Sequence, residues 1–190
     1  MRIITGSAKG KRLKTVEGVT SRPTGDKIKE AIFSVIQFDV ENAVVLDLFA
    51  GSGQLGIEAL SRGARSAYFN DAAQSAVVVI HENLQNTGLS DKAHVSRQYA
   101  EKFLRNTDNR FDIAFVDPPY NIGLVNKVLP KLIEKMHPDG IIICEHEKEL
   151  TLPENIEIFN TDKTYRHGST SVTIYRGTTT NENSDLSGEL

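Results

Sequence analysis

The chain has 190 residues, with 22 Lys and Arg side chains against 25 Asp and Glu, a formal net charge of −3, and 39% hydrophobic residues. This length predicts a single domain with a full-sized core, and the composition excludes a chain disordered throughout. The single cysteine, Cys144, excludes a disulfide framework and a cysteine-based zinc site. No apolar run approaches the roughly 18 residues of a membrane helix, and the first residues lack an apolar signal core, so we expect a cytoplasmic protein without membrane contact.

Charge is unevenly distributed along the chain. Residues 1–29 carry eight basic side chains against two acidic ones, a net charge of +6, which leaves −9 for the remainder. Clustered Lys and Arg bind polyanions because binding releases counterions. Residues 1–29 are therefore predicted to be a basic arm that contacts a polyanion, although a solvated surface segment would have the same composition.

Periodicity changes along the chain after the arm. A helix is predicted from Asp26, which can cap it, with Ile28, Ile32 and Val35 on one face. From residue 43 short apolar runs alternate with amphipathic stretches, a pattern typical of βαβ units around a parallel sheet. The expected strands are 43–49, 66–71, 93–97, 111–117 and 140–145, and the expected helices are 54–62, 73–87, 100–106 and 122–136.

The C-terminal part has no helical pattern. Residues 156–159 and 171–175 are predicted to be two strands around a polar connection, so the sheet should end in an antiparallel hairpin. Residues 178–190 contain no basic and almost no apolar residue, and they are predicted to be disordered. The expected division is a basic arm at 1–29, one domain at 30–177 and a polar tail at 178–190.

A glycine-rich turn follows the first predicted strand. Gly51, Gly53 and Gly56 form a G-x-G-x-x-G pattern, and Asp71 ends the next strand twenty residues after Gly51. The glycines let a ligand approach the helix N-terminus, and the acid can accept hydrogen bonds from ribose hydroxyls, so the pattern predicts a nucleoside cofactor site. NAD would place its pyrophosphate at this turn, whereas S-adenosylmethionine would bring an ammonium group, for which Asp47 is a suitable partner.

The strand at 111–117 runs into Asp117-Pro118-Pro119-Tyr120. Two prolines cannot extend a strand ladder, so they predict a rigid turn at the carboxyl edge of the sheet, where ligands of open α/β folds bind. If the Asp117 carboxylate and the Pro118 carbonyl accept the N–H bonds of an exocyclic amine, its lone pair can face an electrophilic methyl group. Tyr120 can then stack on an extruded base. Because any planar amine suits this geometry, the motif does not identify which base is methylated.

Together, the two motifs resemble those of class I S-adenosylmethionine-dependent methyltransferases that act on amines, and more closely the RsmD family of 16S ribosomal RNA guanine-N2 methyltransferases. The similarity covers about residues 2–177 and is carried by RIITGSAKGKRLK, SRPTGDKIKEAIFSVI, VLDLFAGSGQLGIEALSRGA, the D-P-P-Y turn and YRHGSTSVTIYR. It implies an α/β, Rossmann-like fold with a seven-stranded, mostly parallel sheet and helices on both faces. It also implies S-adenosylmethionine as cofactor and 16S rRNA, or the 30S subunit or its assembly intermediate, as partner. We expect a monomer without a bound metal.

The resemblance assigns roles to individual positions. The cofactor would contact Asp47, Phe49, Ala50, Gly51, Ser52, Gly53, Asp71, Tyr99 and Ala100. The reacting amine would lie at Asp117, Pro118, Pro119 and Tyr120, and RNA would contact Arg2, Lys9, Lys11, Arg12, Lys14, Arg22 and Thr24. Asp71 stands where many relatives have Glu, which preserves ribose binding. Tyr99 stands near the place where many class I enzymes have an Asp for the adenine amino group, so backbone groups and packing are expected to hold the adenine.

Three alternatives remain open at this stage. They are methylation of adenine N6 or a glutamine side chain by the same geometry, an NAD-dependent oxidoreductase, and a non-catalytic RNA-binding assembly factor. Cys144 is expected to be a buried hydrophobe, which argues against cytosine methylation through a cysteine nucleophile. Glu145, His146 and Glu147 are expected to form a solvated strand end and not a metal cluster, and His167 either borders the substrate or is an exposed loop residue.

Overall fold

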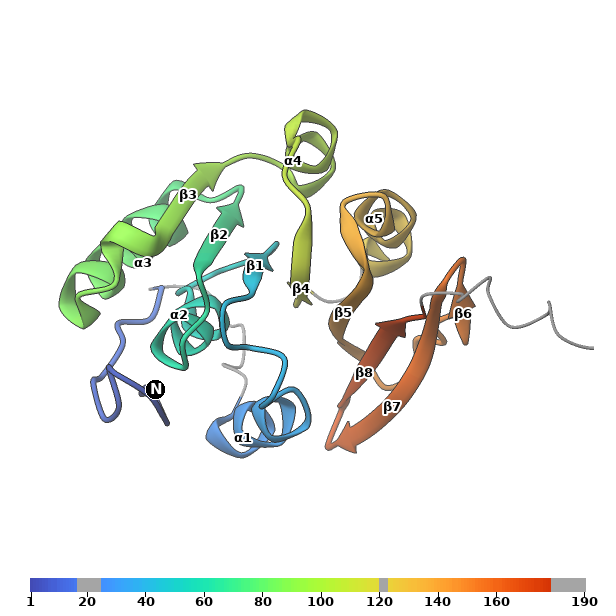
Figure 1. Cartoon of the computed structure of the whole chain (residues 1–190), viewed down its shortest axis with the longest axis horizontal. Helices are drawn as coiled ribbons and strands as arrows, with labels where there is room; N and C mark the ends of the chain where they lie inside the picture. The colour runs from blue at the N-terminus through green and yellow to red at the C-terminus, as the bar shows by residue number, and fades with distance from the viewer. Residues whose placement is uncertain (17–24, 120–122, 179–190) are drawn as a thin grey trace, which may run out of the picture.

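The computed structural model describes residues 1–16, 25–119 and 123–178 (Figure 1). Three residues with predicted roles, Arg22, Thr24 and Tyr120, lie outside the described residues, as does nearly all of the predicted tail. Within the described ranges the chain forms one eight-stranded sheet in the order β3-β2-β1-β4-β5-β8-β7-β6. The sheet is flanked by helices on both faces, as predicted.

The strands and helices have the following bounds. The strands are β1 (Val44–Asp47), β2 (Ser66–Asp71), β3 (Ala93–Arg97), β4 (Phe111–Val116), β5 (Met136–Glu147), β6 (Asn155–Ile156), β7 (Phe159–His167) and β8 (Thr170–Gly177). The helices are α1 (Asp26–Val35), α2 (Gln54–Ser61), α3 (Gln74–Thr87), the 3-10 turn η1 (Ser90–Lys92), α4 (Ala100–Asn106) and α5 (Leu124–Ile133).

The strand order positions the ligand edge of the sheet. Strands β1 to β5 pair in parallel, and β5, β8, β7 and β6 pair antiparallel. From β1 the chain first runs outward through β2 and β3 and then returns to β4 on the other side of β1. The segments that leave β1 and β4 therefore diverge at the carboxyl edge, and such a topological switch point is where open α/β sheets bind ligands.

Two apolar layers hold the sheet between its helices. Val45 and Phe115 belong to the layer shared with α1, α2 and α3, whereas Leu46 and Val116 belong to the layer shared with α4 and α5. The assignment alternates because successive strand residues point to opposite faces, and strands buried on both faces are hydrophobic throughout. Figure 1 shows α4 and α5 on one side of the sheet and α1 and α2 on the other.

Residues 1–14, here called the N-terminal hairpin, pack onto the α1–α3 side of the domain. Arg2 and Arg12 form an antiparallel bridge, and Ile3, Ala8 and Leu13 are buried in the same apolar layer as α1, α2 and α3. The first half of the predicted arm thus combines a basic outer surface with apolar residues that belong to the domain core.

The hairpin approaches α2 without an intervening side chain at Gly6. A Cβ atom added at Gly6 would lie 1.7 Å from the backbone oxygen of Ser61 at the end of α2, and Gly6 has a φ of +87°. Only glycine satisfies both conditions without displacing the backbone.

The predicted capping role of Asp26 is wrong. Helix α1 is preceded by Gly25 at its N-cap, and no side chain caps it, so Asp26 does not have the predicted capping role. Asp26 instead forms an ion pair with Arg2 at 3.5 Å.

The C-terminal hairpin also differs from its prediction. Ile156–Phe159 is not one strand, because Glu157 has a φ of 53° and the chain reverses there into β7. Most of the polar segment predicted as a connection lies in β7, whose side chains are largely exposed. A polar sequence can form a strand where an antiparallel pair faces water. The reversal adds the two-residue strand β6, which makes eight strands where seven were expected.

Candidate cofactor and substrate site

The glycine turn between β1 and α2 is anchored on both sides. Gly51 and Gly53 have φ values of 54° and 77°. The backbone N–H of Leu48 donates to the oxygen of Phe115 at 3.1 Å, and that of Ala50 donates to the oxygen of Asn70 at 3.0 Å. The turn is therefore fixed to β4 on one side and to β2 on the other.

The third glycine of the pattern has a packing role. A Cβ atom at Gly56 would lie 2.3 Å from Cε1 of Phe69, a buried residue of β2. Any larger residue would push α2 away from the sheet, and with it the turn at its start. This contact explains why the pattern continues to a third glycine.

Asp47 presents a buried carboxylate at the end of β1. Its Oδ2 accepts the backbone N–H of Gly56 at 3.0 Å, and the side chain is almost fully buried. The pKa of Asp47 is raised to about 7, mainly by burial; the Gly56 hydrogen bond opposes this shift, and the negative charge of Asp71 adds a smaller upward contribution. A carboxylate with this environment gains from a cationic ligand, which fits the ammonium group expected from the sequence.

Asp71 lies at the end of β2 and faces the same turn. Its Oδ2 accepts the N–H of Gly51 at 2.9 Å, and its Oδ1 accepts the N–H of Ala73 at 2.9 Å. Each carboxylate oxygen has a further lone pair, so the half-buried Asp71 can also accept hydrogen bonds from ligand hydroxyls.

Asn70 supports this edge and was not selected from the sequence. Its Nδ2 donates to the oxygens of Leu48 at 3.2 Å and Gln98 at 3.1 Å, and its Oδ1 accepts from Ser96 at 2.8 Å. Asn70 thereby connects the segments that follow β1 and β3. Asn70 is almost fully buried, and the sequence signal that could have identified it is an asparagine within an otherwise strand-forming run.

The residues expected near the adenine lie where α4 begins. Tyr99 precedes the helix and is 78% exposed, whereas Ala100 is buried. Phe49 and Ser52 are half-buried in the glycine turn, and Ala50 is buried. All of these residues belong to the segments at the carboxyl edge of the parallel strands.

The D-P-P segment follows β4 next to the glycine turn. Asp47 of β1 pairs in register with Phe115 of β4, so Asp117 lies two residues beyond the level of Asp47 on the neighbouring strand. Asp117 is half-buried, Pro118 is buried and Pro119 is exposed. The structure therefore brings the predicted amine-binding turn and the predicted cofactor turn together at one edge.

The end of β5 corrects one prediction and confirms another. Glu145 and His146 are buried by pairing with β8, so they do not form a solvated strand end. The His146 ring hydrogen-bonds Thr173 Oγ1 and the oxygen of Glu147, each at 2.9 Å. Cys144 is fully buried, as predicted, and burial raises the pKa of its thiol.

Within the described residues, no group of three or more His, Cys, Asp and Glu side chains is arranged to hold a metal ion. None of the helices in the ranges 1–16, 25–119 and 123–178 is long and apolar enough to cross a membrane.

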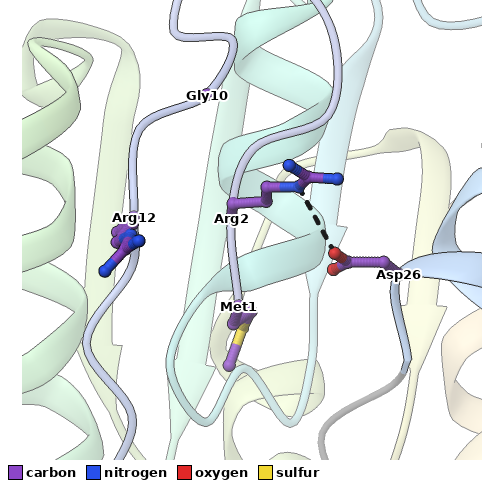
Figure 2. A pocket seen from close by; sticks show the side chains of 5 residues that line it. All are labelled: Met1, Arg2, Gly10, Arg12 and Asp26. Carbon is purple, nitrogen blue, oxygen red and sulfur yellow. Dashed lines mark ion pairs between the residues drawn. The ribbon is translucent and has the colours of Figure 1, made fainter.

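The basic residues of the N-terminal hairpin are exposed near the cofactor turn. Figure 2 shows an open polar hollow lined by Met1, Arg2, Gly10, Arg12 and Asp26, in which the Arg2 guanidinium faces Asp26. The hydroxyl of Ser52 in the glycine turn donates to the Met1 sulfur at 3.5 Å. The hollow therefore lies beside the glycine turn.

The remaining lysines of the hairpin are also on its surface, and all three predicted positions are exposed: Lys9, Lys11 and Lys14. Lys11 Nζ donates to the oxygen of Asn86 at 2.7 Å, and Lys14 pairs with Glu82 at 3.2 Å. Both contacts join the hairpin to α3.

A buried ionic cluster fixes the hairpin to α1 and α2. Lys29 is fully buried, and its Nζ donates to the oxygen of Arg2 at 2.6 Å and lies 3.6 Å from Glu58. Glu58 also accepts the N–H groups of Ile4 and Thr5 at 2.8 and 3.0 Å, and Arg62 Nε at 2.8 Å. Burial lowers the pKa of Lys29, and the charge of Glu58 opposes this shift.

This cluster changes how the charge of the predicted arm is interpreted. Lys29, counted among the basic residues of the arm, is enclosed in the protein and unavailable to a polyanion. The sequence signal that could have revealed the cluster is Glu58, the single carboxylate of the run QLGIEALS, and the structure buries all eight residues of this helix.

Comparison with known proteins identifies the family. A family model described as Conserved hypothetical protein 95 matches residues 1–176. The chain belongs to this family. Its relatives include YlbH of Bacillus subtilis (strain 168), which is 40% identical over 181 residues that cover 93% of this chain and 98% of YlbH. Another is ribosomal RNA small subunit methyltransferase D of Haemophilus influenzae, 36% identical over 162 residues that cover 82% of this chain and 84% of that protein.

Solved structures agree with this family assignment. The structure of YhhF from Escherichia coli superposes with a TM-score of 0.84 at 31% identity, covering 93% of this chain and 97% of YhhF. The class I methyltransferase fold and the resemblance to the RsmD family, both predicted from the sequence, are confirmed.

Proposed function

We propose that this protein transfers a methyl group from S-adenosylmethionine to the N2 amine of a guanine in 16S ribosomal RNA. The observation that carries the proposal is the juxtaposition of Asp47 and Asp117, which follow neighbouring strands whose register pairs Asp47 with Phe115. A cofactor turn and an amine-binding turn at the same switch point are what direct methyl transfer between two bound molecules requires. The relative named ribosomal RNA small subunit methyltransferase D supports rRNA as the substrate.

The described residues fit the cofactor. S-adenosylmethionine supplies an electrophilic methyl group when it is bound. Asp47 would hold its ammonium group, because the buried carboxylate lacks a cation among its described hydrogen bonds and has a raised pKa. Asp71 would hold the ribose hydroxyls, and the turn at Gly51 is open, since a Cβ atom added there meets no described atom within 4 Å.

Asp117 and Pro118 would orient and activate the amine. An exocyclic amine is a weak nucleophile because its lone pair is delocalised into the ring. Acceptance of its N–H bonds by the Asp117 carboxylate and the Pro118 carbonyl would turn the lone pair towards the methyl group. The same two acceptors would stabilise the positive charge that develops on nitrogen. The two prolines restrict the backbone that presents these acceptors.

The N-terminal hairpin would bind the RNA backbone. Arg2 and Arg12 line the hollow beside Ser52, and Lys9 and Lys11 extend the positive surface along the hairpin. Guanidinium groups suit phosphate because they donate two parallel hydrogen bonds. We place this activity in the cytoplasm, on 16S rRNA or on an assembling 30S subunit, with Arg22, Thr24 and Tyr120 as further proposed contacts.

Labelled S-adenosylmethionine tests the proposal. The protein is incubated with 16S rRNA or assembling 30S particles, and the RNA is digested to nucleosides. Label should appear in N2-methylguanosine. Label in N6-methyladenosine, in DNA or in protein would contradict the substrate, and thermal stabilisation by NADH but not by S-adenosylmethionine would contradict the cofactor.

A further inference from the structure

We propose that Asn83 couples the N-terminal hairpin to the cofactor turn, so that RNA binding and cofactor binding strengthen each other. The inference rests on the proposed function, because it takes the hairpin as the RNA surface and the turn as the S-adenosylmethionine site. Asn83 acts here as a positioning residue on α3, outside both binding surfaces.

The Asn83 side chain joins two segments that are far apart in the sequence. Its Oδ1 accepts the backbone N–H of Lys14 at 2.8 Å, and its Nδ2 donates to the oxygen of Lys14 at 3.0 Å. The same Nδ2 donates to the oxygen of Ser52 at 2.9 Å. One amide thus holds the end of the hairpin and the glycine turn simultaneously.

Burial makes these bonds interdependent. Asn83 is 1% exposed, so water cannot readily replace a partner that moves away. If the hairpin opens at Lys14, the Asn83 amide loses two of its three hydrogen bonds. The amide can then rotate, which weakens its remaining hydrogen bond to the Ser52 oxygen. If the turn moves at Ser52, a buried N–H loses a partner, which is unfavourable. The ordered hairpin and the ordered turn therefore favour each other.

Both ends of the connection lie next to binding groups. Lys14 follows Lys11 and Arg12 of the basic surface, and Ser52 lies between Gly51 and Gly53 of the cofactor turn. A second contact reinforces the connection, since the Ser52 hydroxyl donates to the Met1 sulfur at 3.5 Å. RNA that orders the hairpin would thus order the turn, and cofactor bound at the turn would order the hairpin by the same factor, as linkage requires.

Asn86 provides a matched control on the same helix. It lies one turn after Asn83, is exposed, and its Nδ2 donates to the oxygen of Arg12 at 2.9 Å. Among the described residues, the hydrogen bonds of Asn86 with Lys11 and Arg12 reach the hairpin, and none reaches the glycine turn. Asn86→Ala therefore weakens a hairpin contact without cutting the connection to Ser52.

Hydrogen exchange tests the inference without RNA. S-adenosylhomocysteine, whose binding is first measured by calorimetry, should slow amide exchange in residues 1–14 of the wild-type protein by about fivefold or more. Asn83→Ala should exchange faster in this segment and lose the response, while Asn86→Ala should keep it. Asn83→Ser, which is too short to bridge Lys14 and Ser52, should reproduce the loss if Asn83→Ala does not fold. A response in a folded Asn83 variant equal to that of the wild type would overturn the inference.

RNA binding supplies the second readout. In the wild type, S-adenosylhomocysteine should raise the affinity for a 16S rRNA fragment. The ratio of the RNA affinities with and without S-adenosylhomocysteine should fall to about one in the Asn83 variants. Failure of S-adenosylhomocysteine to bind the wild type would overturn the proposed function and the inference with it. Normal methylation of guanine with unchanged coupling in the Asn83 variants would overturn the inference alone.

Discussion

Asp47 and Phe115 face each other in register on the parallel strands β1 and β4, and the N–H of Leu48 donates to the Phe115 oxygen at 3.1 Å. This pairing fixes the distance along the sheet between the glycine turn and the D-P-P turn. Asp117 follows Phe115 by two residues and comes directly after the end of β4, so the central ladder sets where the D-P-P turn begins relative to the glycine turn. A substitution at Asp117 should therefore change the rate of methyl transfer without changing the affinity for the cofactor.

Asp117→Asn should lower the rate of methyl transfer by about a hundredfold to a thousandfold, because one acceptor of the reacting amine becomes a weaker, uncharged one. The affinity for S-adenosylhomocysteine should stay within about twofold of the wild type, since Asp117 lies beyond the cofactor turn. Single-turnover kinetics and calorimetry measure the two quantities. Asp108→Asn, an exposed residue before β4, serves as the control, and loss of cofactor binding in Asp117→Asn would contradict the assignment.

Cofactor affinity should rise with pH through the pKa of Asp47. Burial raises this pKa to about 7, so much of the carboxyl group is protonated in the empty protein at slightly acidic pH. An ammonium ligand requires the ionised form, and binding between about pH 6 and pH 7 should therefore release a proton. Calorimetry in buffers of different ionisation enthalpy counts the proton. Asp47→Asn should bind more weakly and without this release, and proton release equal to that of the wild type would assign the titration to another group.

The same group affects stability with a defined sign. The folded protein binds the Asp47 proton more tightly than the unfolded chain does, since the folded pKa is about 7 and the ordinary value is 3.8. Its contribution to the free energy of unfolding is largest at low pH and is lost as the pH rises towards about 7. Between about pH 4 and pH 7, the free energy of unfolding of Asp47→Asn, measured by urea denaturation, should rise relative to that of the wild type. A difference between the two proteins that does not change with pH would contradict the raised pKa.

The N-terminal hairpin should contribute to RNA affinity through its charge. Replacing Lys11 and Arg12 by Ala should weaken RNA binding. The slope of log K against the logarithm of the salt concentration should become smaller in magnitude by about 1.4 to 1.8, because two phosphate contacts are lost. Binding of S-adenosylhomocysteine in the absence of RNA should be unchanged. Lys102→Ala with Arg105→Ala, two exposed charges on α4 on the opposite face of the sheet, is the matched control. An equal change in salt dependence for both pairs would contradict the hairpin as the RNA surface.

Packing of the hairpin on α2 can be tested with two glycines. Gly6 and Gly10 both have positive φ values, 87° and 82°, but an added Cβ meets Ser61 only at Gly6. Gly10→Ala should lower the free energy of unfolding by about 1 kcal/mol through backbone strain. Gly6→Ala should cost several times as much, because the backbone must also separate from α2. Equal losses in urea denaturation would mean that the hairpin is not held at this contact.

Local motifs explain how much of the site could be predicted. The glycine turn, Asp71 and Asp117 each follow a strand, and a parallel sheet brings the carboxyl ends of its strands to one edge. Their spacing in the sequence was therefore enough to place them together. Tyr99 and Ala100 are assigned only through the family resemblance, and the structure places them at the same edge because they follow β3.

The residues that hold the site together were not predictable in this way. Asn83 contacts Lys14 and Ser52, and Lys29 contacts Glu58, across separations that only the tertiary fold defines. The sequence offers only indirect signals, such as a polar Asn83 on the helix face that also carries the buried Ile80 and Thr87. The prediction of a polar connection where β7 lies is wrong for a related reason, since nothing local distinguishes an exposed strand from a polar loop.

The most direct test of the proposed function is the methylation state of 16S rRNA in the source organism. In cells that lack this gene, one N2-methylguanine should be absent from 16S rRNA, and the wild-type gene should restore it while the gene carrying Asp117→Asn should not. Mass spectrometry of nuclease fragments measures this. An unchanged set of methylated guanines in 16S rRNA, or full restoration by Asp117→Asn, would contradict the account.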